Sequence, residues 1–448
     1  MESRVSSENK MGVMPVNPLL LSMAWPMILA MLVGACYNIV DSLFVSHYSE
    51  NALTAVSLAY PIQNLIVAIG TGVGVGANAL LASYLGQKDP DSADKTAMHS
   101  VIIGACFYLL LLLFGLFAVR QYFLIQTDDP EIMEMGTQYL KIVAIFSFGQ
   151  IFELIGEKLL QATGRTVYTM ITQASGAVLN IILDPILIFG LLGFPEMGTM
   201  GAAAATVIGQ IFAMLLGIYF NLCKNKEIHW TWRGFRIERV YVSQICRLGI
   251  PTIIMNAMTA VMSFGINKII LSYSSTAAAV FGAYFKIQTF VYMALFGLNN
   301  ALLSIVAFNR GAERPDRVEK AILLAGVYSA GIGAIGTLVM FFFAEQLLSA
   351  FNPSETMLAM GMTAFRILSL TFVFGGLSTM VSYALQGFAR GFSSMVISAM
   401  RQVILLLPLA LLFSSWMGLQ GVWIGYLAAE IMTAFIALVY LQRVKKTA

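Results

Sequence analysis

Uncharged apolar runs of about twenty residues recur along the whole of this 448-residue chain. A helix of about twenty apolar residues crosses roughly 30 Å of hydrocarbon, so each run is long enough to span a bilayer. Charged residues make up only 11% of the chain, against about 25% in an average soluble domain. We therefore predict an all-α polytopic membrane protein.

Hydropathy and the polar or Gly/Pro segments between runs predict twelve transmembrane helices. The spans cover residues 19–45, 53–84, 96–118, 137–157, 167–190, 199–222, 248–273, 277–308, 321–343, 359–385, 393–415 and 419–441. Several are longer than a bilayer requires, which indicates tilted helices or helices that extend beyond the bilayer.

Lysine and arginine determine the predicted orientation, because they are enriched in short cytoplasmic loops. With the N-terminus inside, twenty of the 26 basic residues fall in cytoplasmic segments, and Arg120 alone falls outside. The twenty are Arg4, Lys10, Lys88, Lys95, Lys158, Arg165, Lys224, Lys226, Arg233, Arg236, Arg239, Arg247, Arg310, Arg314, Arg317, Lys320, Arg390, Arg443, Lys445 and Lys446. We expect a multi-pass protein of the plasma (inner) membrane with both termini in the cytoplasm. The first span is too long for a signal peptide and has no cleavage site, so no removed targeting segment is expected.

The chain contains one six-span unit twice. At an offset of 225 residues, GQKDPDSADK (86–95) matches GAERPDRVEK (311–320) at Gly, Pro, Asp and Lys, and LQATGR (160–165) lies over LQGFAR (385–390). Because six is even, both copies share one orientation, as in transporters built from parallel repeats. The repeat predicts two pseudo-symmetric six-helix bundles: an N-lobe (1–222), a cytoplasmic linker (223–247) and a C-lobe (248–448).

Other functional classes find little support. A net charge of +3 is too small for binding nucleic acid through its phosphates. The four cysteines lack metal or disulfide spacing, and the three histidines lie in three different segments, so we expect free thiols and no enzyme active site. The glycine-rich run GTGVGVGAN (70–78) lies within the second span with no strand before it, which favours close helix packing over phosphate binding.

Acidic residues inside the spans carry most of the functional information, because a carboxylate in the bilayer needs a partner, a water-filled cavity or a function. Asp41 in the first span and Asp184 in the fifth lie at similar depth in the N-terminal half, and Asn180 lies one turn before Asp184 on the same helix face. Two acids in an apolar pocket can hold a proton near neutral pH. With amide and hydroxyl oxygens nearby, the same carboxylates could instead bind sodium.

Two prolines can loosen the helices that carry these acids, Pro26 in the first span and Pro185 beside Asp184. In the second copy, at offsets one or two residues away from 225, Asp41 falls opposite Asn267, a candidate cavity residue, and Asp184 falls opposite Leu407. The scaffold was duplicated without the acids, which favours an ion-coupling role confined to the N-terminal half. The alternative is that both acids only satisfy backbone or lysine groups in the bundle.

The remaining charges inside spans leave alternatives open. Glu153 and Glu157, one turn apart in the fourth span, are interpreted as an inner gate or as members of ion pairs. Glu430 and Arg401 are predicted to form a buried structural pair, with substrate contact as the alternative. Lys286 could extend its ammonium to the membrane surface or line a cavity of the second half.

Five motifs together resemble the multidrug and toxic compound extrusion (MATE) family, and most closely its DinF-like, MepA-type prokaryotic branch. They are NIVDSLFV in the first span, GQKD after the second, LQATGR after the fourth, LNIILDPILIFG in the fifth and GAAAAT in the sixth. The resemblance covers essentially the whole chain.

This resemblance implies two six-helix lobes around a central cleft. It implies a secondary active multidrug exporter that exchanges cationic, amphipathic drugs for H⁺ or Na⁺ by alternating access. The coupling acids would be Asp41 and Asp184, joined by Asn180 and Thr206, and these four residues could also hold Na⁺. Pro26 matches the place where the first helix bends in family members. A second cation site, on the seventh and tenth helices of NorM-like members, is not expected, because residues 250–273 and 359–385 contain no acid.

An alternative function is a flippase for lipid-linked oligosaccharides, which related folds perform. Such proteins usually have a strongly cationic cleft, whereas the second half offers few cations inside its spans, namely Lys268, Lys286, Arg366 and Arg401. We expect a monomer in the lipid bilayer, with small-molecule substrates, no cofactor, no nucleic-acid partner and no catalytic residues.

Overall fold

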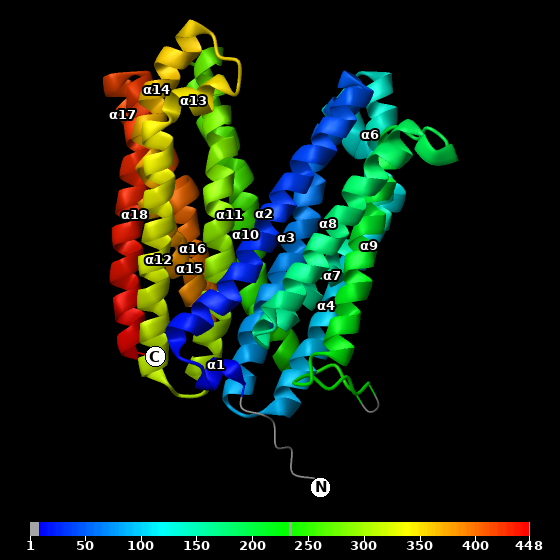
Figure 1. Ribbon diagram of the computed structural model, residues 1–448, viewed down its shortest axis with the longest axis vertical. Coiled ribbons are helices and arrows are strands. Elements are labelled where there is room, and N and C mark those ends of the chain that lie inside the picture. Colours follow the sequence, from blue (N-terminus) through cyan, green and yellow to red (C-terminus); the bar gives the residue numbers. More distant parts are fainter. Residues whose placement is uncertain (1–8, 233–234, 448) are drawn as a thin grey trace. The chain divides into compact units, whose positions relative to one another are not determined.

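The protein is almost entirely helical. The structure, a computed structural model, describes residues 9–232 and 235–447, and none of these residues forms a β-strand. Eleven helices or helix pairs within this part are long and apolar enough to cross a membrane, and α6 with α7 adds a twelfth as a pair bent by 45° (Figure 1). The all-α, twelve-span prediction is confirmed; Arg4 and Arg233 of the predicted cytoplasmic set lie outside the described residues.

The helices follow the two copies of the repeat in order. The first copy contains α1 (Lys10–Val13), α2 (Val16–Tyr48), α3 (Glu50–Gly86), α4 (Pro90–Phe117), α5 (Val119–Gln126), α6 (Pro130–Ile145), α7 (Phe148–Ala162), α8 (Thr166–Phe189) and α9 (Thr199–Cys223). The second contains α10 (Arg239–Leu271), α11 (Ser275–Gly311), α12 (Pro315–Phe342), α13 (Ala344–Ser349), α14 (Glu355–Ser369), α15 (Thr371–Gly387), α16 (Gly391–Ala399), the π-helix η2 (Met400–Ile404), α17 (Leu406–Met417) and α18 (Leu419–Thr447).

The repeat extends to the ends of helices. The 225-residue offset carries α3 onto α11 and α4 onto α12 with identical bounds. It also equates the caps Ser49 and Ser274, whose side chains each accept a backbone N–H from the first turn of the helix that follows. Such N-caps satisfy donors that have no partner inside the helix. The two copies are therefore built with the same local signals.

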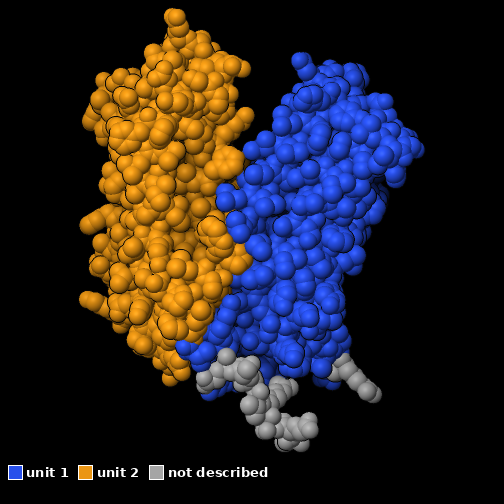
Figure 2. All heavy atoms as spheres, viewed as in Figure 1, with its two compact units in different colours: residues 1–13, 29–253 blue, residues 14–28, 254–448 orange. Residues whose placement is uncertain are grey.

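Contacts divide the chain into two compact units, which do not coincide with the two copies (Figure 2). Among the described residues, unit 1 contains those up to Val13 and Leu29–Ile253, and unit 2 contains Met14–Ile28 and those from Ile254 onward. Both α2 and α10 contribute to both units. The lobe boundaries predicted at residues 222 and 248 follow the repeat and stay a prediction.

Each of these two shared helices contains a proline near the point where it changes units. Pro26 lies two residues before the changeover in α2, and Pro251 lies two residues before the changeover in α10. The 225-residue offset equates the two prolines. A proline inside a helix removes a hydrogen bond and allows a bend.

Glycines set the close helix packing of unit 1, as predicted for the run at 70–78. A Cβ at Gly74 would lie 2.6 Å from the Cγ of Lys158 on α7, and one at Gly76 would lie 2.5 Å from the carbonyl oxygen of Ile245 on α10. These contacts leave no room for side chains. The run therefore packs α3 against two neighbours rather than binding phosphate.

Gly201 at the α8–α9 contact provides a test of this packing. A Cβ there would lie 2.5 Å from the backbone carbonyl of Leu187, so Gly201→Ala is expected to separate the helices and destabilise the protein by about 1–3 kcal/mol. The matched control is Gly34→Ala, because a Cβ at Gly34 meets no atom within 4 Å. Thermal unfolding of detergent-purified protein measures both. Equal melting temperatures for the two variants would contradict the packing role of Gly201.

Candidate functional site

Asp184 forms the centre of a polar group buried in unit 1. Its residue exposure is 0%, and Asn180 and Thr206 are also buried. In the amide orientation that satisfies both of its atoms, Asn180 donates from Nδ2 to Oδ2 of Asp184 over 3.1 Å, and its oxygen accepts the backbone N–H of Thr206 over 3.1 Å. The amide thus connects the acid on α8 to Thr206 in α9.

Close packing of α8 and α9 makes this arrangement possible. A Cβ at Gly209 would lie 2.8 Å from the carbonyl oxygen of Gly176 and 3.2 Å from the Cβ of Asn180. Small residues that allow backbones to approach are typical of helix interfaces in membranes. The spacing of Asn180 and Asp184 by one turn then places both side chains on the face toward α9.

Asp41 on α2 completes a pair of carboxyl groups. The carboxyl groups of Asp41 and Asp184 lie close enough to interact with each other. Asp41 is half-buried, and its Oδ1 has no hydrogen-bond partner among the described residues. A hydrogen bond between two carboxyl groups requires a proton on one of them, because two adjacent carboxylates repel each other. Four residues singled out from the sequence therefore meet in one site: Asp41, Asn180, Asp184 and Thr206.

Two tyrosines also belong to this site and were missed in the sequence. Tyr37 interacts electrostatically with both Asp41 and Asp184. Tyr139 does the same, and its buried hydroxyl accepts a hydrogen bond from Nε2 of Gln63 over 2.7 Å. Tyr37 lies one turn before Asp41 on α2, a spacing that could have identified it. Tyr139 carries no local signal, because only the packing of α6 brings it to the pair.

The site can hold one proton between two acids or a small hard cation among their oxygens. A shared proton would remove the repulsion between the carboxylates. Sodium would be bound by the carboxylates and the Thr206 hydroxyl, and the Asn180 amide would have to turn its oxygen toward the ion; oxygens of these types are the ligands that hard cations prefer. The donor set is compatible with either ion.

Glu153 and Glu157 are buried deep in α7 rather than at an open surface. Glu153 accepts a hydrogen bond from Nε2 of Gln150 over 3.3 Å, and it interacts electrostatically with Tyr37. Glu157 is 2% exposed and lies beside Lys158. The structure thus buries both acids of α7 inside unit 1.

Lys158, which the sequence predicts to lie just beyond the fourth span in a cytoplasmic segment, is buried at the end of α7. It is 4% exposed, its stem packs against Gly74, and its ammonium donates to Oε1 of Gln161 over 3.0 Å. The absence of a side chain on Gly74 creates the space that this lysine fills.

The predicted hinge residues lie inside helices as expected, Pro26 within α2 and Pro185 within α8. Pro26 belongs to unit 2, whereas Asp41 on the same helix belongs to unit 1. Pro185 directly follows the buried Asp184.

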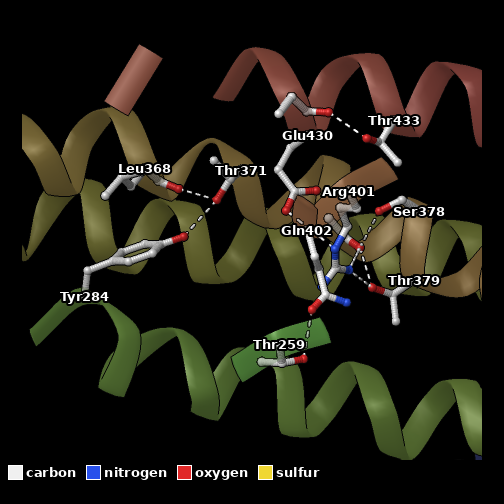
Figure 3. Close-up of polar contacts among 12 residues, drawn as sticks. Thr259, Tyr284, Leu368, Thr371, Ser378, Thr379, Arg401, Gln402, Glu430 and Thr433 are labelled. Atoms are coloured by element: carbon white, nitrogen blue, oxygen red, sulfur yellow. Dashed lines mark hydrogen bonds and ion pairs between the residues drawn. The ribbon is translucent and has the colours of Figure 1, made fainter. Parts of the chain in front are cut away.

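Unit 2 contains a second buried polar cluster, which surrounds the predicted Arg401–Glu430 pair (Figure 3). Nε of Arg401 lies 3.7 Å from Oε1 of Glu430, and its Nη1 donates to Oγ1 of Thr379. The guanidinium also lies 5.3 Å from the centre of the Tyr292 ring. Among the described residues, Oε2 of Glu430 and the hydroxyl of Tyr292 have no hydrogen-bond partner.

The π-helix η2 positions Arg401 in this cluster. Single π-turns within α-helices are often found at functional sites, because they shift the side chains of one turn. Gln402, on the same turn, accepts a hydrogen bond from the hydroxyl of Thr259 on α10 over 2.9 Å (Figure 3). The two predicted cavity residues are placed separately: Asn267 is half-buried on α10, and Lys286 is exposed on α11, 5.9 Å from the centre of the Phe351 ring.

A twelve-span repeat fold with paired acids inside one unit defines a membrane transporter rather than a soluble binding protein. Comparison with known proteins identifies the family. The MatE family model matches residues 26–186 and 251–412, so the chain belongs to the MatE family.

Similar proteins extend over nearly the full length of the chain. An FAD transporter of Shewanella oneidensis is 27% identical, over 91% of this chain and 90% of its own length. The multidrug export protein MepA of Staphylococcus aureus strain MRSA252 is 24% identical, over 97% of this chain and 95% of its own length.

Solved structures agree with this assignment. An outward-facing multidrug resistance MATE transporter of the MOP superfamily superposes with a TM-score of 0.93 at 25% identity, covering 99% of this chain and 98% of the other. A MOP superfamily transporter from Pyrococcus furiosus superposes with a TM-score of 0.92 at 25% identity, covering 98% of both chains. The family predicted from sequence motifs is confirmed.

Proposed function

We propose that this protein is a secondary active multidrug exporter that exchanges cationic or amphipathic drugs for H⁺ or Na⁺. The observation that carries the proposal is the Asp41–Asp184 carboxyl pair, which lies in unit 1 with Asn180 and Thr206. The similarity to MepA multidrug export proteins supports the choice of substrate. The protein would act in the plasma membrane with both termini in the cytoplasm.

The transport cycle would follow from the charge of the pair. A cation bound by Asp41 and Asp184 lowers the negative charge of the site by one, and its release restores that charge. Loading and unloading would therefore favour different conformations, and Pro26 provides a place where α2 can bend between them. Drug release would follow cation binding from outside, and return of the cation-loaded carrier would discharge the ion inside.

A liposome experiment tests this function. Purified protein in liposomes carries a fluorescent cationic dye while a pH gradient and a sodium gradient are imposed separately. We expect one gradient to drive dye accumulation of about tenfold per coupled ion for a tenfold ion gradient. Dye flux that is indifferent to both gradients would contradict the proposal.

A second candidate substrate is an anionic dinucleotide, which the similarity to an FAD transporter favours. Arg401 in unit 2 is a buried cation that could pair with a phosphate. Adding FAD to the same liposomes separates the two candidates. Gradient-driven FAD uptake with no dye uptake would favour the dinucleotide.

A further inference from the structure

A cavity of about 510 Å³ lies in unit 1, at the turn between α7 and α8 and at the end of the predicted span 167–190. It is lined by residues of the N-terminal segment, this turn and the linker: Asn9, Lys10, Thr163, Gly164, Arg165, Thr166, Val167, Tyr168 and Glu227. Neither the coupling pair nor the cluster around Arg401 contributes to it. Seven of these nine residues have polar side chains, which is compatible with a polar ligand.

Positive charge in the cavity exceeds negative charge. Lys10 and Arg165 face one acid, Glu227. The pKa of the Lys10 ammonium is lowered, mainly by burial and secondly by the positive charge of Arg165. The negative charge of Glu227 raises the pKa but does not compensate for these two effects. The one carboxylate beside Lys10 therefore does not balance the positive charges of Lys10 and Arg165. An anion bound in the cavity would supply that charge.

The first turn of α8 adds donors to the same place. This 24-residue helix begins at Thr166, and its N-cap residue Arg165 makes no side-chain capping hydrogen bond. The first N–H groups of a helix have no partner inside the helix, and they carry partial positive charge. Phosphate groups commonly bind at such helix starts.

Three polar atoms around the cavity have no hydrogen-bond partner within the described part of the chain: Nε of Arg165, Oγ1 of Thr166 and Oε2 of Glu227. Thr166 is fully buried, with 0% exposure. A buried donor without a partner costs about 1–3 kcal/mol, so such groups are rare unless a ligand or water satisfies them. The Thr166 hydroxyl is thus an independent indication of a ligand.

The second copy of the repeat shows that the fold itself does not require this hydroxyl. The 225-residue offset equates Thr166 with Gly391 and Arg165 with Arg390. Both turns have the same backbone, with Gly164 and Ala389 in the left-handed region. Arg390 hydrogen-bonds to the hydroxyl of Tyr440, whereas Arg165 faces the cavity. The two turns share a backbone, but only the turn in unit 1 carries a hydroxyl at this position and an arginine whose Nε has no partner among the described residues.

We propose that this cavity is a binding site for a phosphate group, either a phospholipid headgroup or a free phosphate compound. Its oxygens would accept hydrogen bonds from the Thr166 hydroxyl, from Nε of Arg165 and from the first backbone N–H groups of α8. Lys10 would contribute charge. Glu227 opposes binding, which limits the site to ligands of low negative charge. The site is separate from ion coupling and does not rest on the proposed transport function.

Thermal shift of detergent-purified protein tests the proposal, because a ligand that binds only the folded protein raises the melting temperature. The probes are inorganic phosphate, dioctanoyl phosphatidic acid and dioctanoyl glycerol, which has the same chains without phosphate. We expect stabilisation by one or both phosphate-bearing probes and none by dioctanoyl glycerol. If only phosphatidic acid shifts the melting temperature, the ligand is a phospholipid. If inorganic phosphate and phosphatidic acid bind with equal affinity, the ligand is a free phosphate compound.

Variants connect the shift to the cavity. Thr166→Val removes only a hydroxyl that has no protein partner, so the protein should fold, while its affinity for the phosphate-bearing probe falls about tenfold. Lys10→Gln should weaken binding similarly. Glu227→Gln keeps the oxygen that accepts from Asn9 and removes the opposing charge, so inorganic phosphate should bind more tightly. Lys320→Gln, the same charge change on the exposed surface of α12, is the control and should bind as the wild type does.

The proposal is overturned if neither phosphate-bearing probe stabilises the wild type. It is also overturned if Thr166→Val and Lys10→Gln bind as tightly as the wild type, or if Glu227→Gln weakens phosphate binding. Transport activity does not enter these measurements, so their result is independent of the coupling mechanism.

Discussion

An Asp184→Asn transporter is expected to lose ion-driven accumulation of dye completely. Asparagine cannot take up or release a proton, and its amide is a weaker sodium ligand than a carboxylate. The imposed gradient would then do no work, and the accumulation ratio would fall from about tenfold per coupled ion to one. Liposome uptake under the driving gradient measures this ratio, and Asp41→Asn should give the same result, because the two carboxyl groups form one site.

Asp128→Asn is the matched control, because Asp128 is exposed in the loop between α5 and α6. It should accumulate dye as the wild type does. Full coupling in both Asp184→Asn and Asp41→Asn would exclude the pair as the coupling site. Binding of the dye in the absence of a gradient should survive the substitutions, which would separate lost coupling from lost folding.

An Arg401→Met protein is expected to be destabilised by about 3–5 kcal/mol, because the substitution leaves the buried Glu430 without its counter-charge. Glu430 is 2% exposed, and its Oε2 already has no hydrogen-bond partner within the described residues. Loss of the guanidinium also removes the donor to Thr379. Thermal unfolding in detergent measures the effect.

The double variant Arg401→Met with Glu430→Leu distinguishes the charge from the packing. Replacing both members of a buried ion pair by apolar groups is often neutral, so stability should return close to that of the wild type. If the double variant is as unstable as the single one, the cost comes from packing around η2 instead. If the single variant is as stable as the wild type, the pair contributes no stability.

The parts of the fold that depend on periodic, local signals were predictable from the sequence. Apolar run length located the spans, and the 225-residue offset anticipated the matching bounds of α3 and α11. The pair Asp41 and Asp184 could also be found, because acids inside apolar helices are rare and the second copy lacks them. Asn180 followed from helical spacing.

The rest depends on contacts between segments distant in the sequence. Tyr139 reaches the Asp41–Asp184 pair only through the packing of α6, and Lys158 is buried because Gly74 on another helix leaves it space. The fourth predicted span, 137–157, bends by 45° where α6 ends and α7 begins. Hydropathy averages over such a break, and it contains no information on which helix a side chain will meet.

The start of α2 belongs to unit 2 although the rest of the helix belongs to unit 1, and this division has a consequence for synthesis of the chain. Residues 14–28 pack within unit 2, where a Cβ at Gly297 on α11 would lie 2.6 Å from the backbone nitrogen of Ile28 and the hydroxyl of Tyr328 donates to Asn17. These partners leave the ribosome more than 250 residues after Ile28. The first membrane helix must therefore remain in the bilayer half-assembled until most of the protein has been made, and neither half of the chain contains all the contacts that complete its own fold.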